Sequence, residues 1–375
     1  MSGPSDRAKA WAATMAGHDH GPGLVRAHAD EGARLSAYPA LRRERREEIE
    51  ALSLRPGATL ADGAGERATP ERPDPDRTCF ERDRDRILHS AAFRRLAGKT
   101  QVFVFPADHQ RTRLTHALEV AQVATGIGRA AGLNPALTDA IAIGHDCGHG
   151  PGGHASEEAF DAFLPEGYDH AVWGADVVLV PLNLCLQTLD GIRNHSWARP
   201  TPATPEGEVV SWADRIAYCA HDFEDAVQAG VISATDLPAA VADVCGRSRR
   251  DQLSTFIGAV VQCIQEEGVV GMAAEPAAAL AALRSFNYER IYSRPESVAQ
   301  SAAVVALLRA LVEHFIAHPG ALPAEHRPSE RVPDPMRAAV AYVAGMTDRF
   351  AFSTAERELG WPVERLPRGI DVGSA

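Results

Sequence analysis

The sequence predicts an all-α fold, and three observations support this prediction. Beyond residue 80, apolar residues recur at helical spacing in one segment after another, and short breaks separate the segments. Strict alternation of apolar and polar residues is nearly absent, and TQVFVF at residues 100–105 is the best strand candidate. A chain of 375 residues with 45% hydrophobic content is also long and apolar enough to bury a large core. We therefore expect a globular protein built from packed helices.

The first 78 residues are expected to form a helical arm followed by a linker. Residues 1–50 contain short helical pieces, and LRRERREEIEAL at 41–52 is typical of a charged surface helix. From residue 53 to about residue 78 the chain is dense in Pro, Gly and charge and shows no periodicity. Such a composition indicates a loop or linker.

Local start and stop signals place three helices in the middle of the chain, at residues 113–132, 134–148 and 204–230. Asn134 and Thr204 are suitable N-caps, and each precedes a proline at the first helical position. Glycine ends each of the three segments. The residues on these helices that could bind a metal ion or a substrate are His116 on the first, His145 and Asp146 in the last turn of the second, and Asp214 and Tyr218 on the third.

The C-terminal part contains further amphipathic helices but no second cluster of reactive side chains. AAVVALLRALVEHFIAH at 302–318 and PMRAAVAYVAGMTDRFAFSTAEREL at 335–359 carry these helices. Their apolar surface exceeds what one compact core obviously needs. We therefore expect a dimer or a larger homo-oligomer.

Composition limits the class of protein. The N-terminus has no apolar leader, and no run approaches the eighteen or more apolar residues of a membrane span, so we expect a soluble, cytoplasmic protein. Six cysteines without a C-x-x-C pair indicate reduced core thiols. The net charge of −12 opposes binding to polyanions. Nucleic-acid binding would depend on the basic segment at 82–113, for which a solvated helix face is an equal alternative.

Three His-Asp pairs occur, at residues 18–19, 145–146 and 221–222. The first lies in a polar N-terminal stretch, and the third is expected to be solvated or to lie outside a metal's ligand set. The second pair follows a capped apolar helix and opens into a glycine-rich loop, where both side chains can reach one ion. His116 and Asp214 would complete a set of two histidines and two carboxylates, which suits Mg²⁺, Mn²⁺, Fe²⁺ or Co²⁺. From spacing alone, an alternative stays open: the histidines could be buried core residues that are hydrogen-bonded within the protein and bind no metal.

Five separated segments, in matching order from about residue 77 to 350, resemble one known family. They are RDRDRILHSAAFRRLAGKTQVF, RTRLTHALEVAQVATGI, AIGHDCGHGPGGHASEEAF, EGEVVSWADRIAYCAHDFEDAV and YVAGMTDRFA. The family is the bacterial deoxyguanosinetriphosphate triphosphohydrolase-like group within the HD-domain metal-dependent phosphohydrolases. The resemblance implies an HD-domain helical fold with additional C-terminal helices. We expect an N-terminal arm and linker at 1–78, a catalytic core at 79–260 and a C-terminal helical region at 261–375.

The resemblance also implies roles for single residues. The metal ligands fall on His116, His145, Asp146 and Asp214, and the catalytic pair falls on His154 and Glu157. The spacing agrees for this pair, since residues three apart lie one helical turn apart if a helix begins there, so the carboxylate can orient the imidazole. The substrate-binding residues fall on Gln101, Arg113, His149, His170 and Tyr218.

The implied reaction is attack of water at the α-phosphorus of a deoxynucleoside triphosphate, with release of the deoxynucleoside and inorganic triphosphate. Mg²⁺ or Mn²⁺ is the expected cofactor, with Co²⁺ or Fe²⁺ as alternatives. Two other functions stay open: another HD-type hydrolase, such as a 5′-nucleotidase or a phosphodiesterase, and a non-catalytic regulator that binds nucleotide or single-stranded DNA.

The chain departs from the family pattern at two places. Gly150 and Gly152 replace a proline and an aromatic residue in the loop after the His-Asp pair, which predicts a more mobile loop and an emptier pocket. Ala171, Val172 and Trp173 stand where the family usually has Asn, Gln and Ser. Because of both departures, the sequence leaves open which nucleotide base the protein prefers.

Overall fold

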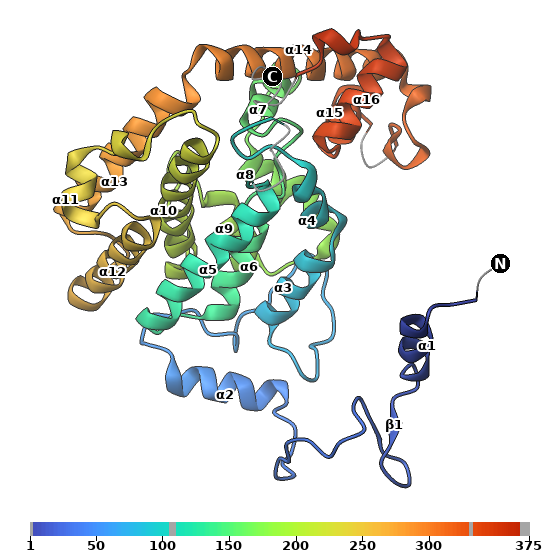
Figure 1. Ribbon diagram of the computed structural model, residues 1–375, viewed down its shortest axis with the longest axis vertical. Helices are drawn as coiled ribbons and strands as arrows, with labels where there is room; N and C mark the ends of the chain where they lie inside the picture. Colours follow the sequence, from blue (N-terminus) through green and yellow to red (C-terminus); the bar gives the residue numbers. More distant parts are fainter. Residues whose placement is uncertain (1–2, 105–109, 330–332, 368–375) are drawn as a thin grey trace. The chain divides into compact units, whose positions relative to one another are not determined.

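The computed structural model describes residues 3–104, 110–329 and 333–367. The all-α prediction is confirmed, because these residues form sixteen α-helices and a single sheet of two short strands (Figure 1). Contacts divide the chain into a small unit, residues 1–41, and a large unit, residues 42–375.

The small unit consists of one helix and one hairpin. Helix α1 (Asp6–Ala13) begins at Ser5, whose hydroxyl accepts a hydrogen bond from the amide of Ala8, and none of its residues is buried. Strands β1 (His18–Asp19) and β2 (Val25–Arg26) pair antiparallel. The first His-Asp pair therefore forms β1, and it belongs to no group of metal donors among the described residues.

The large unit begins with the predicted surface helix, and the segment that follows, residues 54–78, contains no helix or strand, as expected for a loop or linker. Helix α2 (Arg43–Ser53) has no buried residue. In the next segment, Ala61 is buried and the Arg67 side chain donates to a carboxylate oxygen of Asp83 at 2.5 Å and to the carbonyl of Asn183 at 2.6 Å. Ala61 and Arg67 therefore attach this loop to the helical core, although most of its other residues are exposed.

Most helices of the large unit surround the first of two hydrophobic clusters. The bounds of these helices are α3 (Cys79–His89), α4 (Ala91–Arg95), α5 (Arg113–Ala131), α6 (Pro135–Gly144), α9 (Leu186–Asn194), α10 (Pro205–Gln228), α11 (Ala239–Cys245), α12 (Arg249–Glu267) and α13 (Ala274–Asn287). Helices α5, α6 and α10 pack against one another at its centre. All six cysteines are free; four are buried and two are half-buried.

The predicted caps are confirmed, but one predicted helix end is wrong. Asn134 and Thr204 cap α6 and α10, and Gly132 ends α5. Helix α6 ends at Gly144, four residues before the predicted stop, so His145 is its C-cap. The amides of Cys147 and His149 bond in tight turns to carbonyls only three residues earlier, which ends the helical pattern.

The strand predicted at residues 100–105 is absent from the described part of that segment. Thr100 forms only an isolated bridge with Thr112, and residues 101–104 form no strand. Phe105 lies outside the described residues. The Thr100 amide donates to Asp348 instead of to a neighbouring strand.

A second hydrophobic cluster joins five other helices of the large unit. It contains residues of α7 (His154–Asp161), α8 (His170–Trp173), α14 (Pro295–Ala317), α15 (Pro335–Ala344) and α16 (Asp348–Leu359). Helix α14 has a window of mean hydropathy 1.4, so the expectation that no segment approaches the composition of a membrane span was wrong. Seven of its residues, from Val304 to Phe315, are buried against the rest of this chain. Because these helices bury apolar residues within one chain, their apolar composition is no longer a reason to expect an oligomer.

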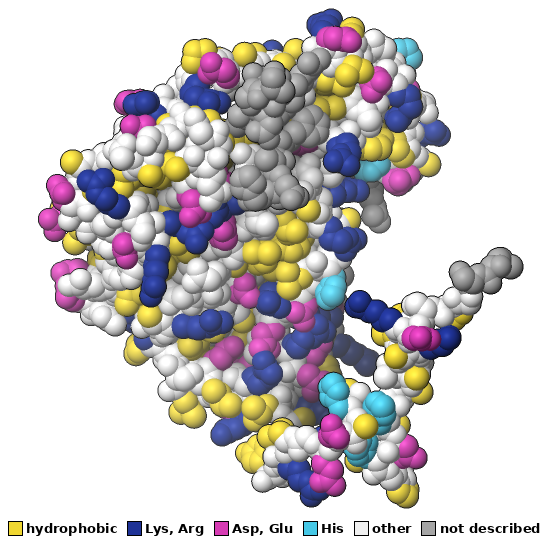
Figure 2. Space-filling model, in the orientation of Figure 1, with side chains coloured by type: hydrophobic (Ala, Val, Ile, Leu, Met, Phe, Trp, Pro, Cys, Tyr) yellow, Lys and Arg dark blue, Asp and Glu magenta, His cyan; other side chains and the backbone are white. Residues whose placement is uncertain are grey.

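The basic segment at 82–113 forms ion pairs inside the fold. Arg84 contacts Asp139, Arg86 contacts Glu71, and Arg111 contacts Glu119 at 2.9 Å. Basic and acidic side chains are likewise interspersed on the face shown in Figure 2. The segment is therefore neither a simple solvated face nor a continuous patch of unpaired cations.

Candidate metal and phosphate site

A cavity of about 440 Å³ in the large unit collects most of the predicted site residues. Helices α5, α7, α8, α10 and α14 contribute to its wall. The predicted residues that line it are Gln101, Arg113, His116, Asp146, His149, His154, His170, Asp214 and Tyr218. The two others do not line the cavity but contact residues that do: His145 contacts Asp146, and Glu157 contacts His170.

The four predicted metal ligands converge from three helices. His116 comes from α5, His145 and Asp146 follow α6, and Asp214 comes from α10. His116 Nε2 lies 3.1 Å from Asp214 Oδ1, and His145 Nε2 lies 3.4 Å from Asp146 Oδ1 and 3.7 Å from Asp214 Oδ1. Metal–ligand bonds of about 2.1 Å place neighbouring donors about 3 Å apart. These spacings therefore fit donors arranged around one cation.

The tautomer of His145 supports the same conclusion. Its Nδ1 donates to the carbonyl of Ala142 at 2.6 Å, so Nε2 carries the lone pair. This Nε2 is buried and has no hydrogen-bond partner. A buried acceptor without a partner is costly. A cation bound at this position would satisfy it, so the residues present fit a divalent metal ion.

The charges around these ligands favour ionised carboxylates. Burial opposes ionisation of Asp146, but His145 and Arg113 outweigh it and hold the pKa of Asp146 well below its usual range. Burial likewise opposes ionisation of Asp214, and the hydrogen bond from His116 lowers the pKa of Asp214. Both carboxylates are therefore anionic at neutral pH, as metal binding requires.

Arg113 offers unused hydrogen-bond donors beside the carboxylates. Its side chain is 2% exposed, and its Nη1 donates to Asp146 Oδ2 at 2.7 Å. Its Nε and Nη2 are buried and have no partner. Gly153 leaves the room for this guanidinium, since a Cβ there would lie 2.6 Å from Nη2. Unpaired guanidinium donors in a cavity suit a phosphate.

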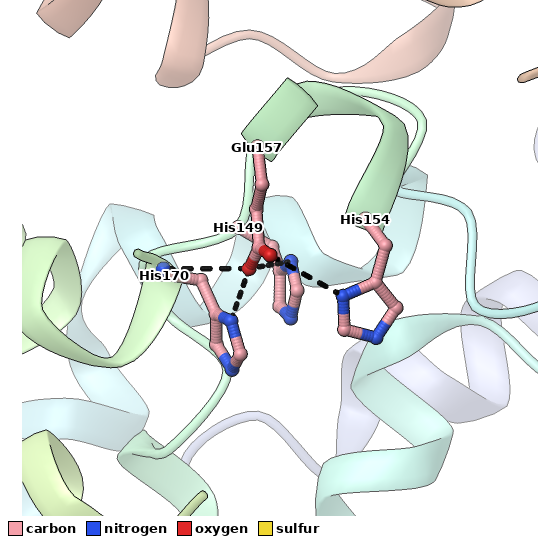
Figure 3. A group of neighbouring side chains, drawn as sticks. All are labelled: His149, His154, Glu157 and His170. Atoms are coloured by element: carbon pink, nitrogen blue, oxygen red, sulfur yellow. Dashed lines mark hydrogen bonds and ion pairs between the residues drawn. The ribbon is translucent and has the colours of Figure 1, made fainter. Parts of the chain in front are cut away.

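The predicted catalytic pair belongs to a cluster of three histidines around one carboxylate (Figure 3). Helix α7 begins at His154, which meets the condition for placing Glu157 one turn later. Glu157 Oε1 accepts a hydrogen bond from His170 Nδ1, while its Oε2 lies 3.7 Å from His154 Nδ1. The His154 side chain is 73% exposed, whereas His170 is buried. Glu157 is thus hydrogen-bonded to His170, whereas its distance to His154 is longer than a hydrogen bond.

This cluster does not suit a single metal ion, although its donors lie within 4.8 Å of one another. The rings of His149 and His170 are stacked, with centroids 3.7 Å apart and planes 14° from parallel. The lone pairs of nitrogen lie in the plane of the ring, so two nearly parallel rings direct them side by side and not toward one point. Within the cluster, Glu157 is hydrogen-bonded to His170, while His149 and His154 lie 3.9 and 3.7 Å from its carboxylate. Burial alone would lower the pKa of His170, but Glu157 outweighs it and raises that pKa.

The glycine-rich loop is held in place, contrary to the expectation of a mobile loop beside an emptier pocket. Gly150 N donates to the hydroxyl of Ser156 at 3.0 Å. At Gly152 the backbone has φ of +71°, and a Cβ would lie 2.4 Å from Val304 of α14. Val304 therefore occupies the side of the pocket next to Gly152.

Several residues that line the cavity were not predicted as site residues from the sequence. They are His195, Arg215, Asp222, Arg284 and Tyr292. Asp222 belongs to the third His-Asp pair, which is buried and not solvated: its carboxylate accepts a hydrogen bond from Tyr292, and His221 Nδ1 lies 3.2 Å from Glu119. His195 directly follows α9, and a lone histidine after a helix matches no motif.

Comparisons with known proteins show which families the chain resembles. Residues 113–219 match the HD domain, and residues 270–357 match the phosphohydrolase-associated domain. A deoxyguanosinetriphosphate triphosphohydrolase-like protein of Caldanaerobacter subterraneus subsp. tengcongensis is 40% identical over 316 residues, which cover 82% of this chain and 93% of that protein. Proteins of the same name from Clostridium perfringens and Desulfatibacillum aliphaticivorans are each 36% identical, with coverage of 82% and 84% of this chain and 94% and 97% of theirs.

Proposed function

The chain belongs to the deoxyguanosinetriphosphate triphosphohydrolase-like family of HD-domain proteins, and we propose that it hydrolyses a deoxynucleoside triphosphate to the deoxynucleoside and inorganic triphosphate. One observation carries this proposal. The cavity is lined by His116, Asp146 and Asp214 next to the unpartnered donors of buried Arg113. His145 Nε2 lies 3.4 Å from Asp146 Oδ1 and 3.7 Å from Asp214 Oδ1 and completes the set of four donors. Its volume of about 440 Å³ lies in the usual range of about 300–1,000 Å³ for ligand pockets.

The four donors would hold a divalent cation, for which Mg²⁺ or Mn²⁺ is the first choice and Co²⁺ or Fe²⁺ also suits the ligand set. When bound, this ion supplies stabilisation of charge on phosphoryl oxygens and lowers the pKa of a water molecule. Arg113 adds two donors, Nε and Nη2, which bind phosphate oxygens and stabilise the charge that grows on them during the reaction.

The histidines around Glu157 are the groups that would transfer protons. We assign the acid–base step to His154 with Glu157, because the imidazole lies in the cavity wall within 3.7 Å of the carboxylate. His149 and His170 line the same wall and are assigned to the phosphates. The closer contact between Glu157 and His170 makes His170 the second candidate for proton transfer.

The aromatic end of the cavity suits the nucleoside. Tyr218, Tyr288 and Tyr292 line it, and Arg284 Nε donates to the Tyr218 hydroxyl at 2.9 Å. Gln101 contributes an amide oxygen that is buried and has no partner. Aromatic faces stack on bases, while amide groups can bond to their edges.

The product identifies the reaction. The purified protein is incubated with each deoxynucleoside triphosphate and ribonucleoside triphosphate in Mg²⁺, Mn²⁺ or Co²⁺, and the products are separated by chromatography. We expect deoxynucleoside and intact triphosphate in equal amounts. Release of orthophosphate or of a nucleoside monophosphate would assign the chain to another class of HD-type hydrolase. Tight binding without any product over hours would indicate a regulator.

We make two further proposals, on the oligomeric state of the protein and on its location in the cell. Following the family resemblance, we propose a homo-oligomer, which light scattering with and without nucleotide would test; a monomer in both conditions would contradict it. We also propose that the protein acts in the cytoplasm, where its six free cysteines would stay reduced.

A further inference from the structure

Lys99 is a buried lysine in a chain that otherwise relies on arginine. The sequence contains 36 arginines and two lysines, Lys9 and Lys99. Lys9 belongs to α1, which has no buried residue, whereas Lys99 is only 4% exposed. A buried ammonium is costly, so its contacts must offset that cost. None of the roles assigned above uses Lys99.

The ammonium of Lys99 binds two backbone carbonyls from distant segments. Its Nζ donates to the carbonyl of His149 in the glycine-rich loop, and it donates at 3.1 Å to the carbonyl of Ala344 at the end of α15. A compact ammonium with three donors can serve two carbonyls that reach one nitrogen, whereas a guanidinium directs its donors within one plane. Both acceptors are uncharged, so the ammonium holds backbone in place and does not neutralise a carboxylate.

The backbone of Lys99 holds a second part of the phosphate site. Its carbonyl accepts a hydrogen bond at 3.3 Å from the amide of Arg113, the first residue of α5. Arg113 and His149 are both proposed above to bind phosphates. Lys99 therefore contacts the backbone of both residues, but it is not one of the residues that line the cavity.

We propose that Lys99 is a positioning residue for phosphate binding: its ammonium fixes the loop at His149 relative to Arg113 and Ala344, and it does not touch the substrate. This inference rests on the proposed function, which assigns His149 and Arg113 to phosphate oxygens. Because a charged donor binds a carbonyl more strongly than a neutral one, the protonated form of Lys99 is the form that holds the loop. A misplacement of about 1 Å can lower turnover by about 10²-fold.

The surroundings of Lys99 bring its titration into a measurable range. Burial lowers the pKa of Lys99 to about 8. The carboxylate of Asp348 and the thiol of Cys147 act in the opposite direction and raise this pKa, whereas Arg113 and Arg95 lower it further. Lys99 is therefore protonated at neutral pH and loses its proton as the pH rises through its pKa. Its hold on the loop should weaken in the same range.

Because the chain has only two lysines, nuclear magnetic resonance can observe Lys99 directly. The full chain is labelled with ¹³C at the lysine Cε, and Lys9→Gln and Lys99→Met assign the two signals. The pH dependence of the Lys99 signal gives its pKa, and kcat/KM for a deoxynucleoside triphosphate is measured from about pH 6 to about pH 10. In the wild type we expect kcat/KM to fall with the pKa of the Lys99 signal. Calorimetric titration with inorganic triphosphate measures phosphate binding without turnover.

Lys99→Met removes the ammonium and keeps a long side chain. It should lower kcat/KM by about 10²-fold at neutral pH. It should also bind inorganic triphosphate more weakly and lack the alkaline fall that has the pKa of Lys99, while its metal content stays at the wild-type level. Lys9→Gln is the matched control, because it removes the other lysine from an exposed helix. It should behave as the wild type in every measurement.

Two results would overturn this inference. One is a kcat/KM of Lys99→Met within about threefold of the wild type, and the other is a wild-type alkaline fall whose pKa differs from that of the Lys99 signal. The second comparison needs only the wild type, so it decides even if circular dichroism shows that Lys99→Met does not fold. If the wild type releases inorganic triphosphate from no nucleotide, the proposed function fails. Equal binding of inorganic triphosphate by wild type and Lys99→Met would then overturn this inference as well, whereas weaker binding by Lys99→Met would support it.

Discussion

Asp348 accepts a hydrogen bond from the backbone amide of Gly152 at 2.8 Å, and this contact connects the C-terminal region to the glycine-rich loop. The other oxygen of the same carboxylate accepts bonds from the amide and the hydroxyl of Thr100, at 2.9 and 2.6 Å. Gly152 lies between His149 and His154, and Thr100 precedes Gln101. One buried carboxylate therefore holds two segments that carry predicted site residues.

Asp348→Asn should lower turnover and stability while the metal stays bound. The asparagine side chain has one acceptor oxygen, and its NH2 group would face a donor of either Gly152 or Thr100, which then has no acceptor. A buried donor without an acceptor costs about 1–3 kcal/mol. Thermal unfolding, steady-state kinetics and metal analysis measure the three effects. Thr100→Val is the control, because it removes only the hydroxyl bond and should have a smaller effect. Unchanged turnover in Asp348→Asn would show that the loop does not depend on this carboxylate.

His145→Ala should lose both the metal ion and turnover, because the remaining donors no longer surround a cation. Treatment of the wild type with a chelator should abolish activity, and added Mn²⁺ should restore it. Metal analysis and product chromatography measure these effects. Full activity in the strict absence of divalent metal would contradict the proposed mechanism.

His154→Ala and Glu157→Ala should keep the metal ion and bind nucleotide nearly normally, because its ligands and Arg113 are untouched. Turnover should fall by about 10²- to 10⁴-fold for His154, as for a positioned acid or base, and less for Glu157 if it only orients the ring. His170→Ala, measured in parallel, separates the two candidates. If His154→Ala stays within about threefold of wild type while His170→Ala loses turnover, the proton-transfer role belongs to His170.

Asp222 should make the folded protein less stable as pH rises from about 4 to 7. Burial raises the pKa of Asp222 to about 7, whereas an unfolded aspartate titrates near about 3.9. Between these values the folded state binds the extra proton, so the free energy of unfolding falls with increasing pH, by at most about 1.4 kcal/mol per pH unit. Asp222→Asn removes this titration. The stability of the variant relative to wild type, from denaturant unfolding, should rise from pH 4 to 7 and level off above; a constant difference would contradict the assignment.

Local sequence signals and the family resemblance were enough to predict the class of fold and to select the residues proposed as metal ligands. The caps at Asn134 and Thr204 and the stop at Gly132 depend on hydrogen bonds within about four residues, so they can be read locally. The order of the His-Asp motifs, together with the family resemblance, selected donors that lie close together in the structure: His145 Nε2 lies 3.4 Å from Asp146 Oδ1, and His116 Nε2 lies 3.1 Å from Asp214 Oδ1.

Which residues meet across the fold could not be predicted from the sequence. His195 faces His170 because α8 and α9 pack together, Asp348 reaches Gly152 from 196 residues away, and Arg67 attaches its loop to Asp83 and Asn183. The expected strand failed for the same reason, since Thr100 bonds to Asp348 and not to another strand. Such contacts depend on how helices pack, and local propensity and spacing carry no information about a partner that is distant along the chain.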